Sequence, residues 1–274
     1  MPVRVPRYIK RVALHEVSAL ARKRNFLTRK MIVSQLEQFG EFAAPILLAH
    51  SSLSACGHVA GGAETVIEAI KDWIGPASLA MPVHTYCYPE SSKPVFVEGL
   101  TPSRSGAITE IFRLSGAALC SIHPSHSLAC GGPLARVICE GHDQCGTPCG
   151  QGTPYCRLVE MDASVLYFGV NLDAATLLHT AEDAAGVPYI YKQDLCRSSV
   201  KYRDGTERTL EFRRHDLNIH RRFANIAPWL EERGLLHRKT FGNGELLFTP
   251  SSRAQHQALV GEMKRDPWFL TDCR

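Results

Sequence analysis

The sequence predicts an α/β fold in which helices cover both faces of a β-sheet. Three observations lead to this class. Short apolar runs rich in strand formers alternate with segments of helical periodicity between about residues 45 and 185. Of the 274 residues, 45% are hydrophobic and 21% are charged, which is typical of a globular chain with a proper core. No stretch approaches the roughly 18 consecutive apolar residues that a membrane helix requires.

The first part of the sheet is predicted from five segments. Residues 45–50 (PILLAH) form a short apolar run that suits a buried strand, and residues 61–75 have the spacing of a helix that ends at a glycine. Residues 77–82 predict a second strand, which is expected to stop at its proline. Residues 105–114 then predict a helix with one apolar face, and residues 127–130 (SLAC) predict another strand.

The second part first continues this alternation of strands and helices, and then includes a predicted β-hairpin. Residues 164–170 (SVLYFGV) predict a buried strand, and residues 176–184 predict a helix after the turn-forming sequence NLDA. Residues 197–212 place an Asp-Gly pair between two segments rich in strand formers, which predicts a β-hairpin. The remaining segments predict a strand at 245–250, flanked by amphipathic helices at 219–233 and 251–265.

The net charge of +4 is distributed unevenly along the chain. Residues 1–30 hold nine Lys and Arg residues and one acid, whereas residues 31–194 hold seven basic and sixteen acidic residues. We expect a basic N-terminal helical extension over residues 1–27 and a single α/β domain over residues 28–274. The acidic middle would attract a cationic substrate, and solvated faces without any partner are the alternative interpretation.

The first residues, MPVRVPRYIKR, lack the apolar core of a signal peptide. We therefore expect a soluble, cytoplasmic protein that has no membrane partner.

Ten cysteines are many for such a chain, and five of them fall between Cys130 and Cys156. Disulfides are not expected in a reducing compartment. No pair has C-x-x-C spacing, but Cys145 and Cys149, close to His142 and Cys156, leave a zinc site open as an alternative. Combined with the basic ends, such a site would fit a zinc-stabilised nucleic-acid-binding protein. The basic ends lack the interleaved aromatic residues that stack on bases, so we expect neither metal nor nucleic acid.

The segment TLLHTAED places His179 and Glu182 three residues apart. On a helix, side chains at this spacing share a face and can meet. The helix begins just beyond a predicted buried strand, at the edge of an α/β sheet where ligands usually bind. A carboxylate beside an imidazole orients the ring and stabilises its protonated form, as a general base requires. The same spacing also occurs by chance on solvated helix faces.

Two further segments concentrate polar groups. The loop HPSHS carries His123 and His126, although histidines in loops are often simply hydrogen-bonded and a metal site would lack a third ligand. In HSSLSACG, a predicted strand ends in three serines, with glycines and a helix beyond. Such a loop can present backbone N–H groups and hydroxyls to an extended polar ligand. It has neither a Walker ending nor a G-x-G-x-x-G fingerprint, and the chain has no G-x-S-x-G elbow.

Taken in order, these segments resemble the aminoglycoside 3-N-acetyltransferase family, an acetyl-CoA-dependent group with its own α/β fold. The matching stretches are HSSLSACG, GGAETVIEAI, MPVHT, PSRSGAITEIFR, IHPSHSLACGGPLA, QGTPYCRL, VLYFGV and T-x-x-H-x-A-E from Thr176 to Glu182. They extend over about residues 28–194. Residues 1–27 have no counterpart in the shorter members, and QGTP replaces the usual Gly-x-Gly-Ser-Pro. The resemblance implies a layered sandwich with a central mixed sheet covered by helices.

The resemblance also implies a cosubstrate, acetyl-CoA, and the residues that handle it. His179 would be the catalytic base, with Glu182 as its partner, and His123 and His126 would line the substrate side. A base is needed because a substrate amine is mostly ammonium at neutral pH and must lose a proton to attack a thioester carbonyl. Backbone N–H groups of the serine loop are candidate oxyanion donors. The implied cofactor-binding residues are Ser51, Ser52, Leu53, Ser54, Val83, His84 and Thr85.

The expected acceptor is a small-molecule amine, namely the 3-amino group of a 2-deoxystreptamine aminoglycoside, and the expected role is antibiotic resistance. Because aminoglycosides are polycations, several carboxylates should surround them. We expect Glu90 and Asp173 in this role, and Glu98 and Asp183 are also near in sequence. The alternative is a CoA-dependent N-acyltransferase of natural-product biosynthesis that acts on another amine. A homodimer is a further expectation.

Overall fold

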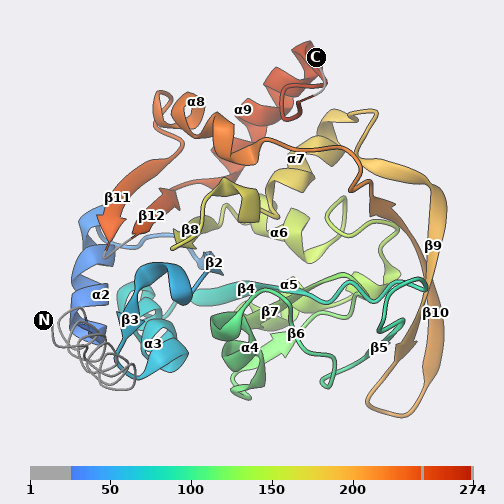
Figure 1. Ribbon diagram of the computed structural model, residues 1–274, viewed down its shortest axis with the longest axis horizontal. Helices are drawn as coiled ribbons and strands as arrows, with labels where there is room; N and C mark the ends of the chain where they lie inside the picture. Colours follow the sequence, from blue (N-terminus) through green and yellow to red (C-terminus); the bar gives the residue numbers. More distant parts are fainter. Residues whose placement is uncertain (1–25, 242–243, 273–274) are drawn as a thin grey trace, which may run out of the picture.

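The computed structural model describes residues 26–241 and 244–272, and its centre is a seven-stranded mixed sheet (Figure 1). Its strands are β2 (Ile46–Ser51), β4 (Ser78–His84), β6 (Ala118–Cys120), β7 (His126–Gly131), β8 (Ser164–Phe168), β11 (His237–Phe241) and β12 (Gly244–Thr249). They lie in the order β11-β12-β8-β2-β4-β7-β6. The central strands β8, β2 and β4 run parallel, and the outer pairs are antiparallel. This is the mixed sheet that the family resemblance implied.

The main sheet is buried on both faces because its central strands are apolar at successive positions. Ile46 and Leu48 of β2 face one core, whereas Leu47 and Ala49 face the other. The first core is covered by α5 (Ala135–Cys139), α6 (Pro154–Glu160), α7 (Leu178–Ala185), α8 (Ala227–Glu231) and α9 (Ser252–Arg265). The second is covered by α2 (Arg29–Leu36), α3 (Gly62–Ile74) and α4 (Ala107–Leu114). None of the helices in the described ranges has the length and apolar composition needed to cross a membrane.

A separate three-stranded sheet lies beside the main one, at the side far from β11 (Figure 1). It consists of β5 (Val95–Val97), β9 (Tyr191–Lys201) and β10 (Glu207–His215), in the order β10-β9-β5. The strands β9 and β10 form the hairpin that the Asp-Gly pair predicted. Asp204 stabilises the turn, since its Oδ1 accepts hydrogen bonds from the backbone N–H and the hydroxyl of Thr206.

The strand predicted over residues 77–82 continues through its proline to His84. The N–H of His84 points away from β7, because it donates to Ser105. Backbone nitrogens two residues apart in a strand face the same side, so the nitrogen of Pro82 also points away from β7. On that side β4 pairs with β2 only as far as Ala80. Pro82 therefore interrupts no ladder hydrogen bond, and the expected stop does not occur.

The prediction of one continuous helix over residues 219–233 is wrong, because this segment contains two shorter elements. The structure has a short 3₁₀ turn, η5 (Phe223–Ile226), followed by α8. Pro228 lacks a backbone N–H and fits only the first turn of a helix, so α8 begins there. The helix predicted near residues 8–24 lies outside the described residues. Two short strands, β1 (Phe26–Leu27) and β3 (His58–Val59), pair in parallel at the start of the described chain.

Candidate active site

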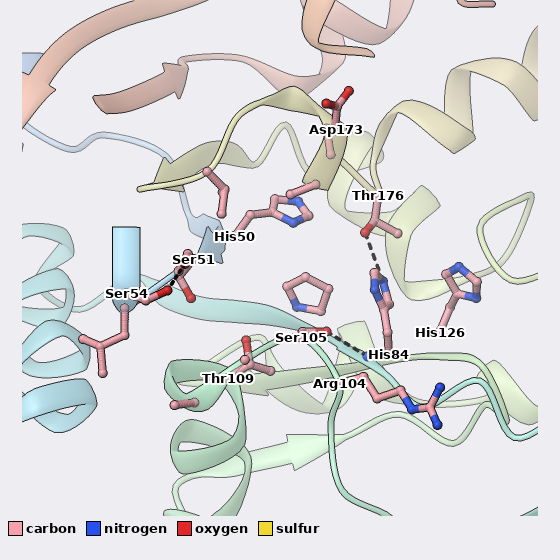
Figure 2. Close-up of a pocket in the computed structure, with 18 of the residues that line it drawn as sticks. His50, Ser51, Ser54, His84, Arg104, Ser105, Thr109, His126, Asp173 and Thr176 are labelled. Atoms are coloured by element: carbon pink, nitrogen blue, oxygen red, sulfur yellow. Dashed lines mark hydrogen bonds between the residues drawn. The ribbon is translucent and has the colours of Figure 1, made fainter. Parts of the chain in front are cut away.

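A cavity of about 820 Å³ opens where β2, β4 and β8 end. Because these strands run parallel, the loops after Ser51, His84 and Phe168 meet at one edge of the sheet. The starts of α3, α4 and α7 complete the wall. In Figure 2, Ser51 and Ser54 lie on one side of this cavity, and His84 and Thr176 lie on the other.

The serine loop lines the cavity as expected from its position after β2. Ser51, Ser52, Leu53 and Ser54 all belong to the lining. The hydroxyls of Ser52 and Ser54 lie 3.2 Å apart, and the backbone N–H of Ser52 donates to Phe168 at 2.9 Å. The Ser51 hydroxyl is buried and has no hydrogen-bond partner among the described residues. This loop therefore offers unsatisfied polar atoms beside the N-terminus of α3.

Of the three predicted residues at the end of β4, only His84 lines the cavity. Its Nε2 lies 3.1 Å from the hydroxyl of Thr176, and its Nδ1 lies 3.2 Å from the hydroxyl of Tyr86. Burial, reinforced by nearby His179, lowers the pKa of His84 to about 4, so the ring is neutral at pH 7. Val83 packs into the core, and the Thr85 hydroxyl donates to Pro124 at 2.6 Å.

The predicted pair on α7 forms in the structure. His179 Nδ1 donates to Glu182 Oε2 over 2.6 Å, while His179 lines the cavity and Glu182 is completely buried. Burial alone would raise the pKa of Glu182, but the charges and hydrogen bonds of His179 and Arg221 outweigh it and lower this pKa. No described residue hydrogen-bonds His179 Nε2. Because Nδ1 donates to Glu182, Nε2 is the ring nitrogen that can contact a ligand in the cavity.

The two histidines of the HPSHS loop have different environments. His126 lines the cavity, and its Nδ1 lies 2.8 Å from the hydroxyl of Ser125. His123 lies outside the lining, with its ring stacked on His142 at 4.6 Å between centroids. Its Nδ1 accepts the backbone N–H groups of Ser125 and His126 at 3.2 and 3.1 Å. The structure therefore places His123 where it shapes the loop that carries His126.

The acidic residues do not converge on the cavity. Asp173 is the one carboxylate among its described lining residues, and it accepts the backbone N–H of Ala224 at 2.9 Å. Glu90 lies outside and pairs with Arg214. The other two expected acids also lie outside this lining, where Glu98 accepts a backbone N–H from Arg203 and Asp183 accepts the Tyr191 hydroxyl. One arginine, Arg104, faces the same space.

Sequence reasoning missed several residues of the site. His50, the residue before the serine loop, is stacked on Tyr167 with ring centroids 5.2 Å apart, and burial lowers its pKa to about 3. Its place at a strand end could have suggested it. His215, at the end of β10, packs against His179 with the two rings tilted and their centroids 4.1 Å apart. Arg221 donates to Glu182. No local signal marks these last two, because both reach the site through tertiary contacts.

The histidine considered as a zinc ligand, His142, is hydrogen-bonded within the protein. His142 Nδ1 lies 2.9 Å from the Ser121 hydroxyl, and its Nε2 lies 3.0 Å from the carbonyl of Pro148. Both ring nitrogens are thus already hydrogen-bonded. Within residues 26–241 and 244–272, no three His, Cys, Asp or Glu side chains form a metal-binding group.

An imidazole hydrogen-bonded to a buried carboxylate, in a cavity at the carboxyl edge of parallel strands, is an arrangement typical of enzyme sites that use general-base chemistry. A family model described as aminoglycoside 3-N-acetyltransferase matches residues 48–259, and the chain belongs to this family.

Curated relatives agree with this assignment. Aminoglycoside N(3)-acetyltransferase III of Salmonella sp is 30% identical over 183 residues, which cover 59% of this chain and 62% of that protein. Aminoglycoside N(3)-acetyltransferase VII of Streptomyces paromomycinus is 31% identical over 193 residues, covering 64% and 67%. The chain thus matches somewhat less than two thirds of the length of the first of these relatives.

Solved structures share the fold. The crystal structure of aminoglycoside acetyltransferase AAC(3)-Xa aligns with a TM-score of 0.80 at 24% identity, covering 92% of this chain and 98% of that one. A mutant of aminoglycoside acetyltransferase AAC(3)-IVa in complex with a gentamicin aligns with a TM-score of 0.75 at 27% identity, covering 89% and 90%.

Proposed function

We propose that this protein transfers an acetyl group from acetyl-CoA to an amine, with His179 as the general base. One observation carries the proposal. His179 is fixed through Nδ1 by a buried carboxylate, and its Nε2 has no hydrogen-bond partner among the described residues, in a cavity of about 820 Å³. That volume suits a drug-sized ligand. The family assignment supports the same reaction class.

The serine loop is the proposed site for acetyl-CoA. Ser51, Ser52, Leu53 and Ser54 supply hydroxyls and backbone N–H groups, and His84 faces them across the cavity. The N-terminus of α3 carries a partial positive charge and Arg104 carries a full one, and both suit phosphate groups. Val83 and Thr85 contribute by holding the end of β4 in place.

The proposed chemistry follows from the position of the base. His179 Nε2 accepts a proton from the acceptor amine, and the nitrogen lone pair attacks the thioester carbonyl. A C–N bond forms, the C–S bond breaks, and coenzyme A leaves as a thiolate that is reprotonated from the imidazolium. Glu182 stabilises the positive charge that develops on His179. Backbone N–H groups of the serine loop are the proposed donors to the transient oxyanion.

We propose an aminoglycoside as the acceptor, acetylated at its 3-amino group. The relatives named above and the gentamicin complex of a neighbour with 27% identity support this choice. Asp173 would pair with one ammonium group of the acceptor, and His126 would lie on the same side. The resulting role is antibiotic resistance.

A second acceptor class is favoured by a specific observation. Asp173 is the single carboxylate in the described lining, and Arg104 offsets its charge. A polycation gains less from such a wall than from a cluster of acids. The alternative is therefore an N-acyltransferase of natural-product biosynthesis that acts on a less cationic amine.

Three proposals concern the chain as a whole. We propose that residues 28–274 form one domain after a basic extension over 1–27, supported by the two cores that share one sheet. We also propose a cytoplasmic location and a homodimer, the latter to be checked by light scattering.

The function is tested by following free thiol in mixtures of the purified full chain, acetyl-CoA and single amines. Gentamicin and kanamycin represent the polycations, and glucosamine represents an amine with one charge. Thiol release with a matching gain of one acetyl group on gentamicin supports the first acceptor. Release only with glucosamine or other weakly charged amines supports the second, and no release with any amine rejects the transferase proposal.

A further inference from the structure

Arg221 binds the same carboxylate as the proposed base. Its Nε donates to Glu182 Oε1 at 2.9 Å and to Oε2 at 3.1 Å, while His179 donates to Oε2. The side chain of Arg221 is only 9% exposed, and that of Glu182 is fully buried. In this buried environment the three groups form one hydrogen-bonded unit.

The guanidinium of Arg221 is held in place on every side. Its Nη1 donates to the carbonyls of Asp216 and Ile219 at 2.8 and 3.3 Å, and its Nη2 donates to the carbonyl of Ile190 at 3.4 Å. Its cation lies over the ring of Tyr189, 5.5 Å from the centroid. Because Arg221 does not belong to the cavity lining, it acts on a ligand only through Glu182.

The backbone around Arg221 is also anchored. Arg221 forms an isolated antiparallel bridge with Thr271. On either side, the N–H of Arg222 donates to Leu270 at 2.9 Å and the N–H of Asp272 donates to His220 at 3.3 Å. The last described residues of the chain therefore fix the position of this arginine.

The charge of Arg221 decides how Glu182 influences the imidazole. A buried carboxylate without a cation would favour imidazolium at rest, and a protonated ring cannot accept a proton. A permanent guanidinium offsets the charge of the carboxylate, so less of that negative charge acts on the imidazole. Other titratable groups also surround this unit. Those that face His179 are His84, His126 and His215. Those around Glu182 and its helix include Cys149, Tyr189, Asp183, Tyr191 and His256.

We propose that Arg221 is a positioning residue, which keeps Glu182 ionised and oriented so that His179 carries its proton on Nδ1 and presents Nε2 to the acceptor amine. The catalytic consequence rests on the proposed transferase function. The tautomer and ionisation of His179 do not, and they can be measured without any substrate.

The test uses the full chain with Arg221→Gln and Arg221→Lys, and the ring nitrogens of His179 are followed by ¹⁵N NMR through a pH titration. In the unaltered protein we expect the Nδ1–H tautomer. In Arg221→Gln we expect a mixture of tautomers and an imidazolium that persists to higher pH. We expect kcat to fall about 10²-fold, as misplaced catalytic groups typically cause, with a smaller change in KM for acetyl-CoA.

Arg113→Gln is the matched control. Arg113 also forms a buried pair, with Glu110 at 2.6 Å and with a side chain only 6% exposed, but no hydrogen bond joins it to His179 or Glu182. It should leave the tautomer and titration of His179 unchanged. An unchanged tautomer and titration in Arg221→Gln, or an equal change in Arg113→Gln, overturns the proposal.

Arg221→Lys keeps the test decisive if Arg221→Gln does not fold. A lysine keeps the charge but cannot reach both carboxylate oxygens and three carbonyls at once, so kcat should stay below that of the unaltered protein. Wild-type kcat and tautomer in this variant would count against the proposal. If the unaltered protein acetylates no amine, the proposed function fails, while the NMR comparison still decides the role of Arg221.

Discussion

Gly169 lies directly against Cys56, and this contact holds the serine loop down on the end of β8. Gly169 has a φ of +69°, and a Cβ added there would stand 2.5 Å from Cys56 Sγ and 3.0 Å from the carbonyl of Ser52. Only glycine fits both the conformation and the space. The path of the serine loop is thus fixed by a residue that has no side chain.

Gly169→Ala should therefore weaken both stability and cofactor binding. The positive φ costs roughly 1–2 kcal/mol for an alanine, and the overlap adds roughly 1–3 kcal/mol. Gly234→Ala is the control, because Gly234 has a similar φ of +66° with open space around it. We expect KM for acetyl-CoA to rise in Gly169→Ala alone, measured beside urea denaturation of both variants. Equal kinetics in the two variants would refute the link between Gly169 and the loop.

His179→Ala should abolish most turnover and leave acetyl-CoA binding nearly intact. Loss of a general base typically lowers the rate about 10²–10⁴-fold. The ring contributes little to the serine loop on the other side of the cavity, so calorimetric affinity for coenzyme A should change little. Unchanged turnover rejects His179 as the base, and a large loss of affinity would point to a binding role instead.

Glu182→Gln should lower turnover less than His179→Ala and move the acidic limb of the pH–rate profile to lower pH. The imidazolium loses its anionic neighbour, and it faces the uncompensated guanidinium of Arg221 at close range. The measurement is kcat/KM across the acidic range, with Asp183→Asn on the same helix as the control. A profile that does not move would show that His179 and Glu182 do not interact in solution.

Acid should destabilise the fold below about pH 6.5, because burial lowers the pKa values of several described histidines. Burial lowers the pKa to about 3 in His50 and His142 and to about 4 in His84. His123, His126 and His215 shift in the same direction for the same reason. In the unfolded chain these groups titrate near 6.5, so below that pH the unfolded state binds more protons and stability falls.

The expected slope is up to about 1.4 kcal/mol per pH unit for each such histidine. Urea midpoints between about pH 7.5 and about pH 5 would measure it. His142→Gln, outside the cavity lining, should make the slope shallower by removing one of these groups. A stability that is flat with pH in this range would contradict the buried, neutral state of these rings.

The alternation of strands and helices was predictable because each element carries its own apolar periodicity. The same holds for the contact between His179 and Glu182, since a spacing of three residues fixes neighbours on any helix. The end of β4 was not predictable from Pro82, because whether a proline breaks a strand depends on which side its nitrogen faces. The pairing of strands in the sheet decides which side is hydrogen-bonded, and the sequence of one segment does not specify that pairing.

The site residues divide in the same way. The serine loop follows from its place after a buried strand. In contrast, Arg221 contacts Glu182 and His215 contacts His179 from segments more than thirty residues away in the chain. Glu90 is close in sequence to residues that line the cavity, but its side chain forms an ion pair with Arg214 on β10. Pairing between residues far apart in the chain does not alter the local apolar periodicity, so the sequence around either partner does not reveal it.

The bridge between Arg221 and Thr271 links the proposed base, through Glu182, to a segment outside the cavity lining. A protein trimmed before Leu270 by a protease, or strained there by a fused affinity tag, would lose the backbone anchor of the guanidinium while its serine loop stayed whole. Such a preparation would still be retained on a coenzyme A column and yet be inert. An affinity tag is therefore best placed away from the segment around Thr271.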